Sequence, residues 1–151
     1  MKKIANVIVF FISIIFINTS VFCQTDDGTS MSPIINQSLS VIEMIESNGF
    51  EIVRIEYDIL KDEKESFRTL QSGWTYNILA FGDNRVQDID LEVYKFNGND
   101  WDLIQKDTDE SSFALVTIKP VVDGLYRVVV KGHNFLKGSN GCHYALIYYH
   151  E

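Results

Sequence analysis

The sequence has few of the residues from which catalytic and metal centres are built. It holds two cysteines and three histidines in 151 residues, and no histidine stands at a zinc-ligand spacing from a cysteine or carboxylate. No Gly-x-Ser-x-Gly, phosphate-binding or dinucleotide-binding motif occurs. Cys142 and His143 are neighbours, so on a strand they would point to opposite faces and could not form a nucleophile pair. We therefore expect a protein that is not an enzyme.

Positive charge is also scarce. There are 13 Lys and Arg against 21 Asp and Glu, a net charge of -8. Removing residues 1–23 takes away Lys2 and Lys3, which leaves 11 basic and 21 acidic residues and a net charge of -10. Such a surface repels phosphate backbones and anionic lipids, which excludes nucleic acid as a partner and leaves cations as natural ones.

Long apolar runs are absent except near the start. The run at residues 4–17 follows Lys2 and Lys3 and ends in a polar Asn-Thr-Ser stretch. It is shorter than the roughly 20 residues that a spanning helix needs, so it predicts a secretory signal peptide over residues 1–23 rather than a membrane anchor. Cleavage after Cys23 would leave Gln24 as the N-terminus of a secreted or periplasmic protein without a membrane span.

Cys23 leaves a second possibility open. It could become a lipidated N-terminal cysteine, making the product a lipid-anchored structural protein of the envelope, although Phe22 is larger than the residue that lipoprotein signals prefer there. If Cys23 is removed with the signal, Cys142 has no disulfide partner within the chain. The exported domain must then rely on its hydrophobic core.

One helix is predicted after a polar, flexible linker at residues 24–31. Ser32 and Pro33 are typical of a helix start, and Asn48 with Gly49 predicts a stop, so we place the helix within residues 32–48. Its apolar stripe comprises Ile34, Ile35, Leu39, Val41, Ile42 and Ile45. We expect the helix to pack on the rest of the domain, the alternative being a partner-docking helix.

From residue 49 onward the apolar pattern has the period of two that is typical of strands. Eight short strands separated by turn signals are expected, near residues 50–57, 66–70, 74–81, 88–96, 101–106, 113–119, 125–131 and 142–149. Asn97-Gly98 is a strong hairpin signal. The pattern predicts an all-β antiparallel sandwich or barrel over residues 49–151. Trp74 is expected in its core, and the nearly all-apolar strand at 113–119 is expected to be covered on both sides.

Several short motifs resemble a known family. They are Gly73-Trp74-Thr75-Tyr76, Gly82-Asp83, Asp88-Ile89-Asp90-Leu91 with a following acidic loop, and the run from Gly124 to Val130. The chain from about residue 50 to 149 resembles bacterial pre-peptidase C-terminal domains. The resemblance implies a jelly-roll β-sandwich similar to bacterial collagen-binding modules, without catalytic residues and in some members with calcium. Such domains usually accompany a secreted enzyme, whereas no catalytic domain occurs in this sequence.

An acidic strand face is the first candidate site. Asp88, Asp90 and Glu92 alternate with apolar residues, which puts the carboxylates on one face about 7 Å apart. Asp88 and Asp90 match the acidic pair of the family motif. Calcium wants about six to eight oxygen ligands, so loop carboxylates would have to join them, and the candidates are Asp83, Asp107 and Asp109. The alternative is that these residues accept turn hydrogen bonds or face solvent.

Trp101 is the second candidate, because it follows the exposed Asn-Gly-Asn-Asp turn and could stack on a ligand. The whole pattern predicts an exported, non-catalytic accessory module that binds a protein, peptide or glycan, with calcium as a stabilising cofactor. One alternative is a small envelope hydrolase that uses paired carboxylates. The lipid-anchored structural protein is the other.

Overall fold

The structure, a computed structural model, describes residues 30–151. The signal peptide predicted at residues 1–23 and most of the linker at 24–31 lie outside the described residues. The described elements are α2 (Ser32–Ser47), β1 (Glu51–Leu60), β2 (Glu63–Leu70), β3 (Tyr76–Gly82), β4 (Val86–Phe96), β5 (Trp101–Asp107), β6 (Phe113–Ile118), β7 (Gly124–Phe135) and β8 (Cys142–His150). Within this range no helix is long and apolar enough to cross a bilayer.

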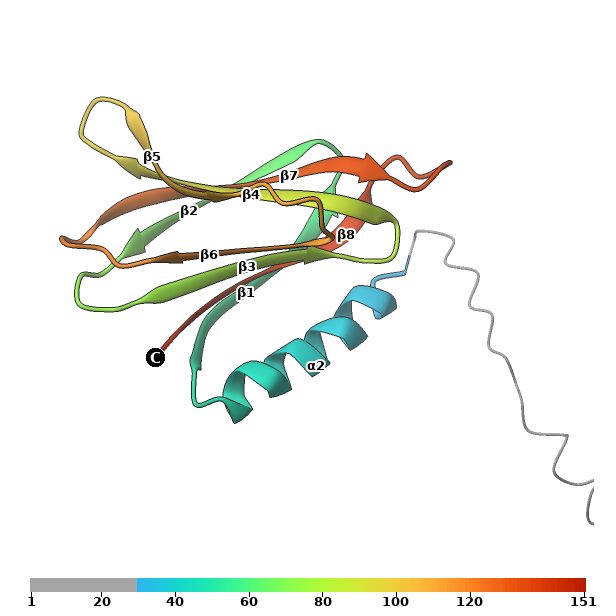
Figure 1. Cartoon of the computed structure of the whole chain (residues 1–151), viewed down its shortest axis with the longest axis horizontal. Coiled ribbons are helices and arrows are strands. Elements are labelled where there is room, and N and C mark those ends of the chain that lie inside the picture. Colours follow the sequence, from blue (N-terminus) through green and yellow to red (C-terminus); the bar gives the residue numbers. More distant parts are fainter. Residues whose placement is uncertain (1–29) are drawn as a thin grey trace, which may run out of the picture.

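The eight strands form two four-stranded sheets that pack face to face (Figure 1). Sheet A has the order β1-β8-β3-β6 and sheet B the order β2-β7-β4-β5, and every pair is antiparallel. Strands that follow one another along the chain mostly alternate between the sheets, which is the arrangement of a jelly roll. The predicted all-β, jelly-roll-like sandwich with one N-terminal helix is confirmed, and the barrel alternative is wrong.

The main core lies between the sheets and follows the predicted alternation. Ile89, Leu91 and Val93 of β4 are fully buried, whereas the alternating acidic residues of the same strand are partly exposed. Leu146 and Tyr148 of β8 meet the β4 residues from the other sheet. Burial of alternate side chains along each strand thus supplies most of the apolar contact that holds the sheets together.

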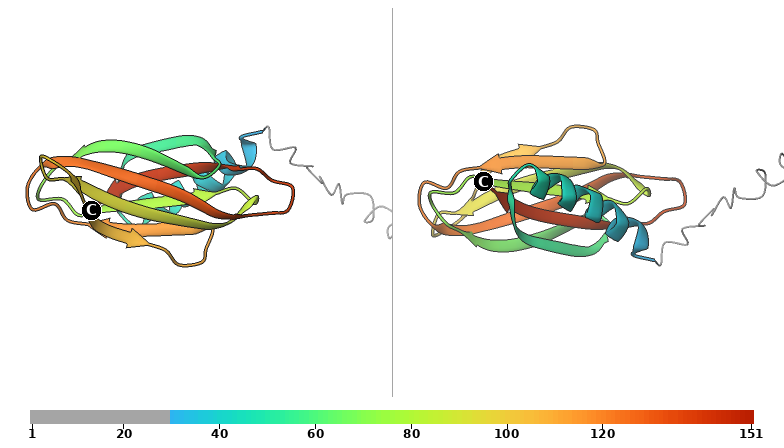
Figure 2. Two further views of the ribbon diagram at one scale, coloured as in Figure 1. Left: turned by 90° about the horizontal axis from the view of Figure 1, so that it is seen from above. Right: turned by 90° about the horizontal axis from the view of Figure 1, so that it is seen from below.

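The helix closes a second, smaller core on the outer face of sheet A (Figure 2, right). Ile34, Val41 and Ile45 pack there against residues of β3 and β8. The helix stops as predicted, because Gly49 adopts a φ of 83° and donates its N–H to the carbonyl of Glu46. The helix begins at Ser32, within the expected range, with Met31 as the N-cap residue, and the N–H of Ser32 donates to the hydroxyl of Ser30 at 3.1 Å.

Three expectations about burial are wrong. Two members of the expected helix stripe are exposed, Leu39 at 54% and Ile35 at 38%. Ser38 takes a buried position because its hydroxyl donates to the carbonyl of Ile34 at 2.7 Å. Trp74 is 40% exposed, since β3 begins only at residue 76 and the alternation does not reach it. Strand β6 is covered on one side only, leaving Phe113 and Leu115 half-exposed beyond the edge of the helix.

Candidate functional site

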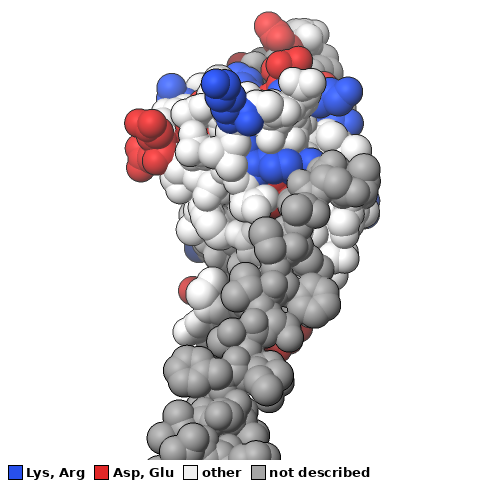
Figure 3. Space-filling model, turned by 90° about the vertical axis from the view of Figure 1, so that its right-hand side faces the viewer, with Lys and Arg blue, Asp and Glu red and all other residues white. Residues whose placement is uncertain are grey.

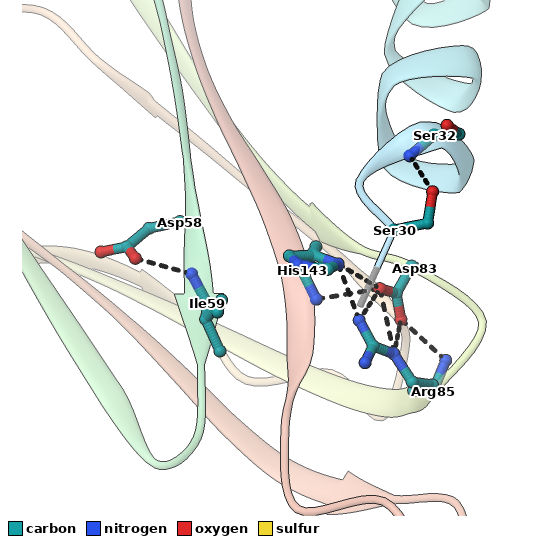
Figure 4. A network of polar contacts seen from close by, with 7 residues as sticks. All are labelled: Ser30, Ser32, Asp58, Ile59, Asp83, Arg85 and His143. Carbon is teal, nitrogen blue, oxygen red and sulfur yellow. Dashed lines mark hydrogen bonds and ion pairs between the residues drawn. The ribbon is translucent and has the colours of Figure 1, made fainter. Parts of the chain in front are cut away.

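Asp83, one of the five proposed calcium ligands, is committed to a buried ion pair. Its carboxylate, in a residue only 2% exposed, accepts the guanidinium of Arg85 through Nε and Nη2. It also accepts the backbone N–H groups of Arg85 at 3.0 Å and His143 at 2.9 Å (Figure 4). Burial opposes ionisation, but the bonds from Arg85 and the His143 amide outweigh it and lower the pKa of Asp83. No lone pair is left over for a metal in this arrangement.

The acidic face of β4 is likewise paired rather than open. Asp90 Oδ2 lies 2.9 Å from Nε2 of His133, and Glu92 accepts Lys131 and Tyr94. Asp88 stands at a bulge between β4 and β7, and its buried Oδ1 has no hydrogen-bond partner among residues 30–151. That orphaned oxygen is the one feature of this face that would favour a cation.

The last two proposed calcium ligands, Asp107 and Asp109, take part in hydrogen bonds within and next to their own loop. Asp107 accepts the backbone N–H of Asp109 at 3.1 Å and that of Leu115 at 2.8 Å, which holds the connection between β5 and β6. Among residues 30–151, no three His, Cys, Asp or Glu side chains are grouped so that they could hold a metal ion. The five carboxylates therefore do not fit calcium as they lie, and calcium binding stays a prediction.

Cys142 and His143 point to opposite faces, as their adjacency indicated. Cys142 lies in the core between the sheets, and burial raises the pKa of its thiol to about 12. His143 lies on the outer face of sheet A, where its Nδ1 accepts a hydrogen bond from Nη2 of Arg85 at 2.9 Å. The thiol is thus protonated at neutral pH and has no imidazole base beside it.

Trp101 belongs to a cluster on the outer face of sheet B, which we name the aromatic face. Its members are Phe67 of β2, Arg127 of β7, Tyr94 and Phe96 of β4, and Trp101 of β5. The register places Phe67 opposite Arg127, and Arg127 opposite Tyr94, so three strands contribute one continuous row. Because regular strands carry this row, its side chains are held in fixed relative positions.

The cluster closes because the β4–β5 hairpin turns up from the sheet (Figure 1). Trp101 starts β5 at one edge of sheet B, yet its ring centroid lies 5.6 Å from that of Phe67 on the opposite edge strand. The tip is the predicted hairpin: Gly98 has a φ of 105°, and Asn97 accepts the N–H groups of Asn99 and Asp100. The turn therefore aims Trp101 back over the strands.

Arg127 lies at the centre of the aromatic face. Its guanidinium carbon is 4.6 Å from the ring centroid of Tyr94 and 5.1 Å from that of Trp101, close enough for cation–π attraction to both. Nη1 donates to Glu65 at 3.1 Å, so the positive charge is also paired with a carboxylate. Tyr94, Trp101 and Glu65 hold the guanidinium in place, so it is pre-organised for a ligand that approaches from the solvent side.

The charges around the aromatic face are balanced. Glu92 accepts Lys131 at 2.7 Å and the hydroxyl of Tyr94 at 2.5 Å. Burial opposes ionisation of Glu92, but these bonds outweigh it and lower its pKa, while the bond to Glu92 raises the pKa of Tyr94 and that of Lys131. Elsewhere the surface is mixed too, since the end of the molecule in Figure 3 shows basic as well as acidic side chains. The acidic excess therefore does not dominate this face.

Sequence reasoning found Trp101 but missed its companions. Phe67 and Arg127 are 34 and 26 residues away from Trp101 along the chain, and only the pairing of β2, β7 and β4 brings them together. The usable signal was the hairpin turn, which placed Trp101 beside an exposed loop. No local motif predicts the order of strands in a sheet, so the other residues of the aromatic face could not be identified from the sequence.

No protein-family model matches the chain, and no curated protein matches it. Similar solved structures include the pre-peptidase C-terminal domain of collagenase from Bacillus anthracis, at a TM-score of 0.48 and 11% identity over 63% of this chain and 87% of that one. Another is the Yersinia pseudotuberculosis-derived mitogen, at a TM-score of 0.46 and 15% identity, over 65% of this chain and 84% of that one. A third is TmCBM61 in complex with β-1,4-galactotriose, at a TM-score of 0.33 and 9% identity, over 71% of this chain and 92% of that one.

The family that the sequence motifs resemble is thus among the structural neighbours. At these identities the likeness concerns the fold alone.

Proposed function

We propose that the protein is an exported, non-catalytic binding module that holds a protein or peptide partner on the aromatic face. The observation that carries the proposal is the stack of Tyr94, Arg127 and Trp101, with half-exposed Phe67 beside it. Tryptophan, tyrosine and arginine are the residues that most often dominate the energetics of protein interfaces.

The stack has the pre-organisation that tight binding requires. Its side chains come from paired strands and contact one another, so few rotamers are left to be frozen when a partner arrives. The ring of Trp101 meets Phe96 at 5.3 Å as well as Phe67 at 5.6 Å, which fixes the indole from two sides. Binding energy is then not spent on ordering the surface.

The surroundings favour a polypeptide over a glycan. Exposed aliphatic side chains flank the stack, with Leu103 opposite Tyr94 on β5 and Leu125 on β7 next to the Arg127 row. Sugar hydroxyls need donors and acceptors at their rim, whereas aliphatic groups suit the apolar side chains of a peptide. A glycan is the second outcome that the experiment below distinguishes.

The test is capture of partners from envelope extract and culture fluid with immobilised wild-type protein, Trp101→Ala and Arg127→Ala. Trp74→Ala is the matched control, because it removes a tryptophan that is more exposed than Trp101 and whose ring contacts His150 of the other sheet. We expect a polypeptide captured by wild type and Trp74→Ala, with at least about 30-fold weaker binding to Trp101→Ala, as for an interface hot spot of about 2 kcal/mol.

Each variant must keep the thermal midpoint of a folded sandwich for the comparison to count. Capture that survives both Trp101→Ala and Arg127→Ala would refute the aromatic face as the binding site. Retention by immobilised oligosaccharides that disappears with Trp101→Ala, without any polypeptide captured, would assign the face to a glycan instead.

A further inference from the structure

One edge of the sandwich is closed by polar residues instead of apolar ones. Strands β1 and β2 lie at the same edge of the two sheets, and their inward side chains form a polar seam comprising Arg54, Glu56, Asp58, Lys64, Ser66 and Arg68. Lys64 pairs with Asp58 at 2.7 Å, and Glu56 receives both arginines and the serine. The seam spans the gap between the sheets and lies over the hydroxyl ends of buried tyrosines.

A pocket of about 230 Å³ opens at one end of the polar seam. Arg54 and Arg68 line it together with Val53, Leu70, Tyr76 and Tyr148. The bulge of β1 between Ile52 and Arg54 lies at the same place, because the extra residue Val53 interrupts the pairing with β8. The walls thus combine two guanidinium groups with aliphatic and aromatic surface.

The two arginines keep unused donors. All their side-chain hydrogen bonds go to Oε1 of Glu56: Nε of Arg54 at 2.7 Å, and Nε and Nη2 of Arg68 at 3.2 and 2.6 Å. Both terminal nitrogens of Arg54 and Nη1 of Arg68 therefore have no hydrogen bond to any residue in the range 30–151. Two guanidinium charges face one carboxylate, so one positive charge is uncompensated.

Tyr148 supplies a second, independent sign of a missing ligand. Its side chain is 1% exposed, and its hydroxyl has no hydrogen-bond partner within the described chain. The nearby hydroxyl of Ser66 donates to Glu56 and lies close enough to lower the pKa of Tyr148 somewhat, but it completes no hydrogen bond of normal geometry with Tyr148. Burial raises the pKa of Tyr148 to about 12, so the group is a neutral donor at pH 7. Buried polar groups are nearly always paired, whereas this hydroxyl makes no hydrogen bond of normal geometry within the described chain.

We propose that this pocket binds a small organic carboxylate, whose oxygens accept N–H groups of Arg54 and Arg68 and the hydroxyl of Tyr148. A planar carboxylate matches the fork of a guanidinium, and the apolar body of the ligand would contact Val53, Leu70 and Tyr76. Phosphate shares the charge but has no apolar body to place there. The site does not depend on the aromatic face, since the two share no side chain.

The test uses benzoate as the probe and its neutral amide, benzamide, as the matched ligand control. Side-chain N–H signals of arginine are followed by NMR during titration of the purified protein, together with the thermal midpoint. We expect benzoate to shift the signals of Arg54 and Arg68, with benzamide and inorganic phosphate binding at least about tenfold more weakly. Equal binding of benzamide, tighter binding of phosphate, or no shift with benzoate would each overturn the proposal.

Tyr148→Phe separates a ligand site from a structural role. It removes only the unpaired hydroxyl, so the free protein should keep or raise its thermal midpoint while benzoate binding falls about tenfold. Arg68→Gln should abolish the binding, and Lys119→Gln, which removes one charge from an exposed position just after β6, should not change it. Tyr148→Phe that lowers the midpoint and leaves benzoate binding intact would assign the hydroxyl to the fold alone.

Discussion

The ion pair of Asp83 with Arg85 gives the sharpest prediction about stability. Asp83→Asn keeps the size of the side chain but removes its charge and places an amide N–H₂ among donors. The native carboxylate accepts three hydrogen bonds from Nε and Nη2 of the guanidinium and two from backbone N–H groups, one of which belongs to His143. Removing one partner of a buried pair costs about 3–5 kcal/mol, because the other charge stays buried without compensation.

We therefore expect Asp83→Asn to lower the free energy of unfolding by about 3 kcal/mol at pH 7, the low end of that range because Arg85 keeps some exposure. For a domain of this size each kcal/mol moves the thermal midpoint by about 4 °C, so a shift of about 12 °C should be seen. Urea unfolding followed by tryptophan fluorescence measures the same difference as a change of midpoint.

The effect should depend on pH in a defined direction. The folded-state pKa of Asp83 lies below its unfolded value, so its contribution is fully present above the unfolded pKa of about 4 and is lost as the pH falls through the folded pKa. The gap between wild type and Asp83→Asn should therefore be constant from pH 5 to 7 and should narrow below pH 4.

Asp109→Asn serves as the control, because its carboxylate lies in an exposed loop and it should change the unfolding free energy by less than about 0.5 kcal/mol. A loss below about 1 kcal/mol for Asp83→Asn, or a gap that stays constant down to pH 2, would refute the role assigned to this ion pair.

Three further predictions concern the helix, the thiol and calcium. Ile34→Ala should destabilise the protein by about 2–5 kcal/mol because Ile34 is fully buried between α2 and sheet A, whereas Leu39→Ala should cost less than about 0.5 kcal/mol in the same urea titration. Cys142 should react with a thiol reagent only at the rate of unfolding, as read from its own peptide by mass spectrometry; fast labelling in native buffer would contradict its burial. Calcium added in place of a chelator should leave the thermal midpoint unchanged, and a rise of several degrees that disappears with Asp90→Asn would show a site after all.

Local patterns predicted most of the fold. The alternation at Ile89, Leu91 and Val93 identified the buried face of β4, and Asn97-Gly98 identified the hairpin between β4 and β5. Alternation predicts the buried face because a strand shifted by one residue against its neighbour would turn its apolar side chains toward water. The helix stripe failed at Leu39, since a buried serine can satisfy its hydroxyl within the helix and frees an apolar neighbour to face solvent.

The sites were predicted less well than the fold, because their members meet only through strand order. Asp83 and His143 are 60 residues apart along the chain and are joined by the pairing of β3 with β8. Asp83 therefore looked like a loop carboxylate free to bind calcium. In the same way, the hairpin turn pointed to Trp101 as a candidate binding residue. The position of Arg127 beneath Trp101 is set by the register of β7 with β4, which the sequence does not reveal.

The place of β8 in sheet A has a consequence for how the protein is made. The last strand of the chain lies between β1 and β3 and pairs with both along nearly its whole length. Until β8 leaves the ribosome, the opening strand has no neighbour in its own sheet, and the helix lacks Ala145 and Ile147, against which it packs. Pairing over so long a separation is slow, so the nascent chain should stay unfolded until β8 has left the ribosome. A ribosome-bound chain that stops before residue 142 should be cleaved rapidly by protease, whereas the released protein should resist.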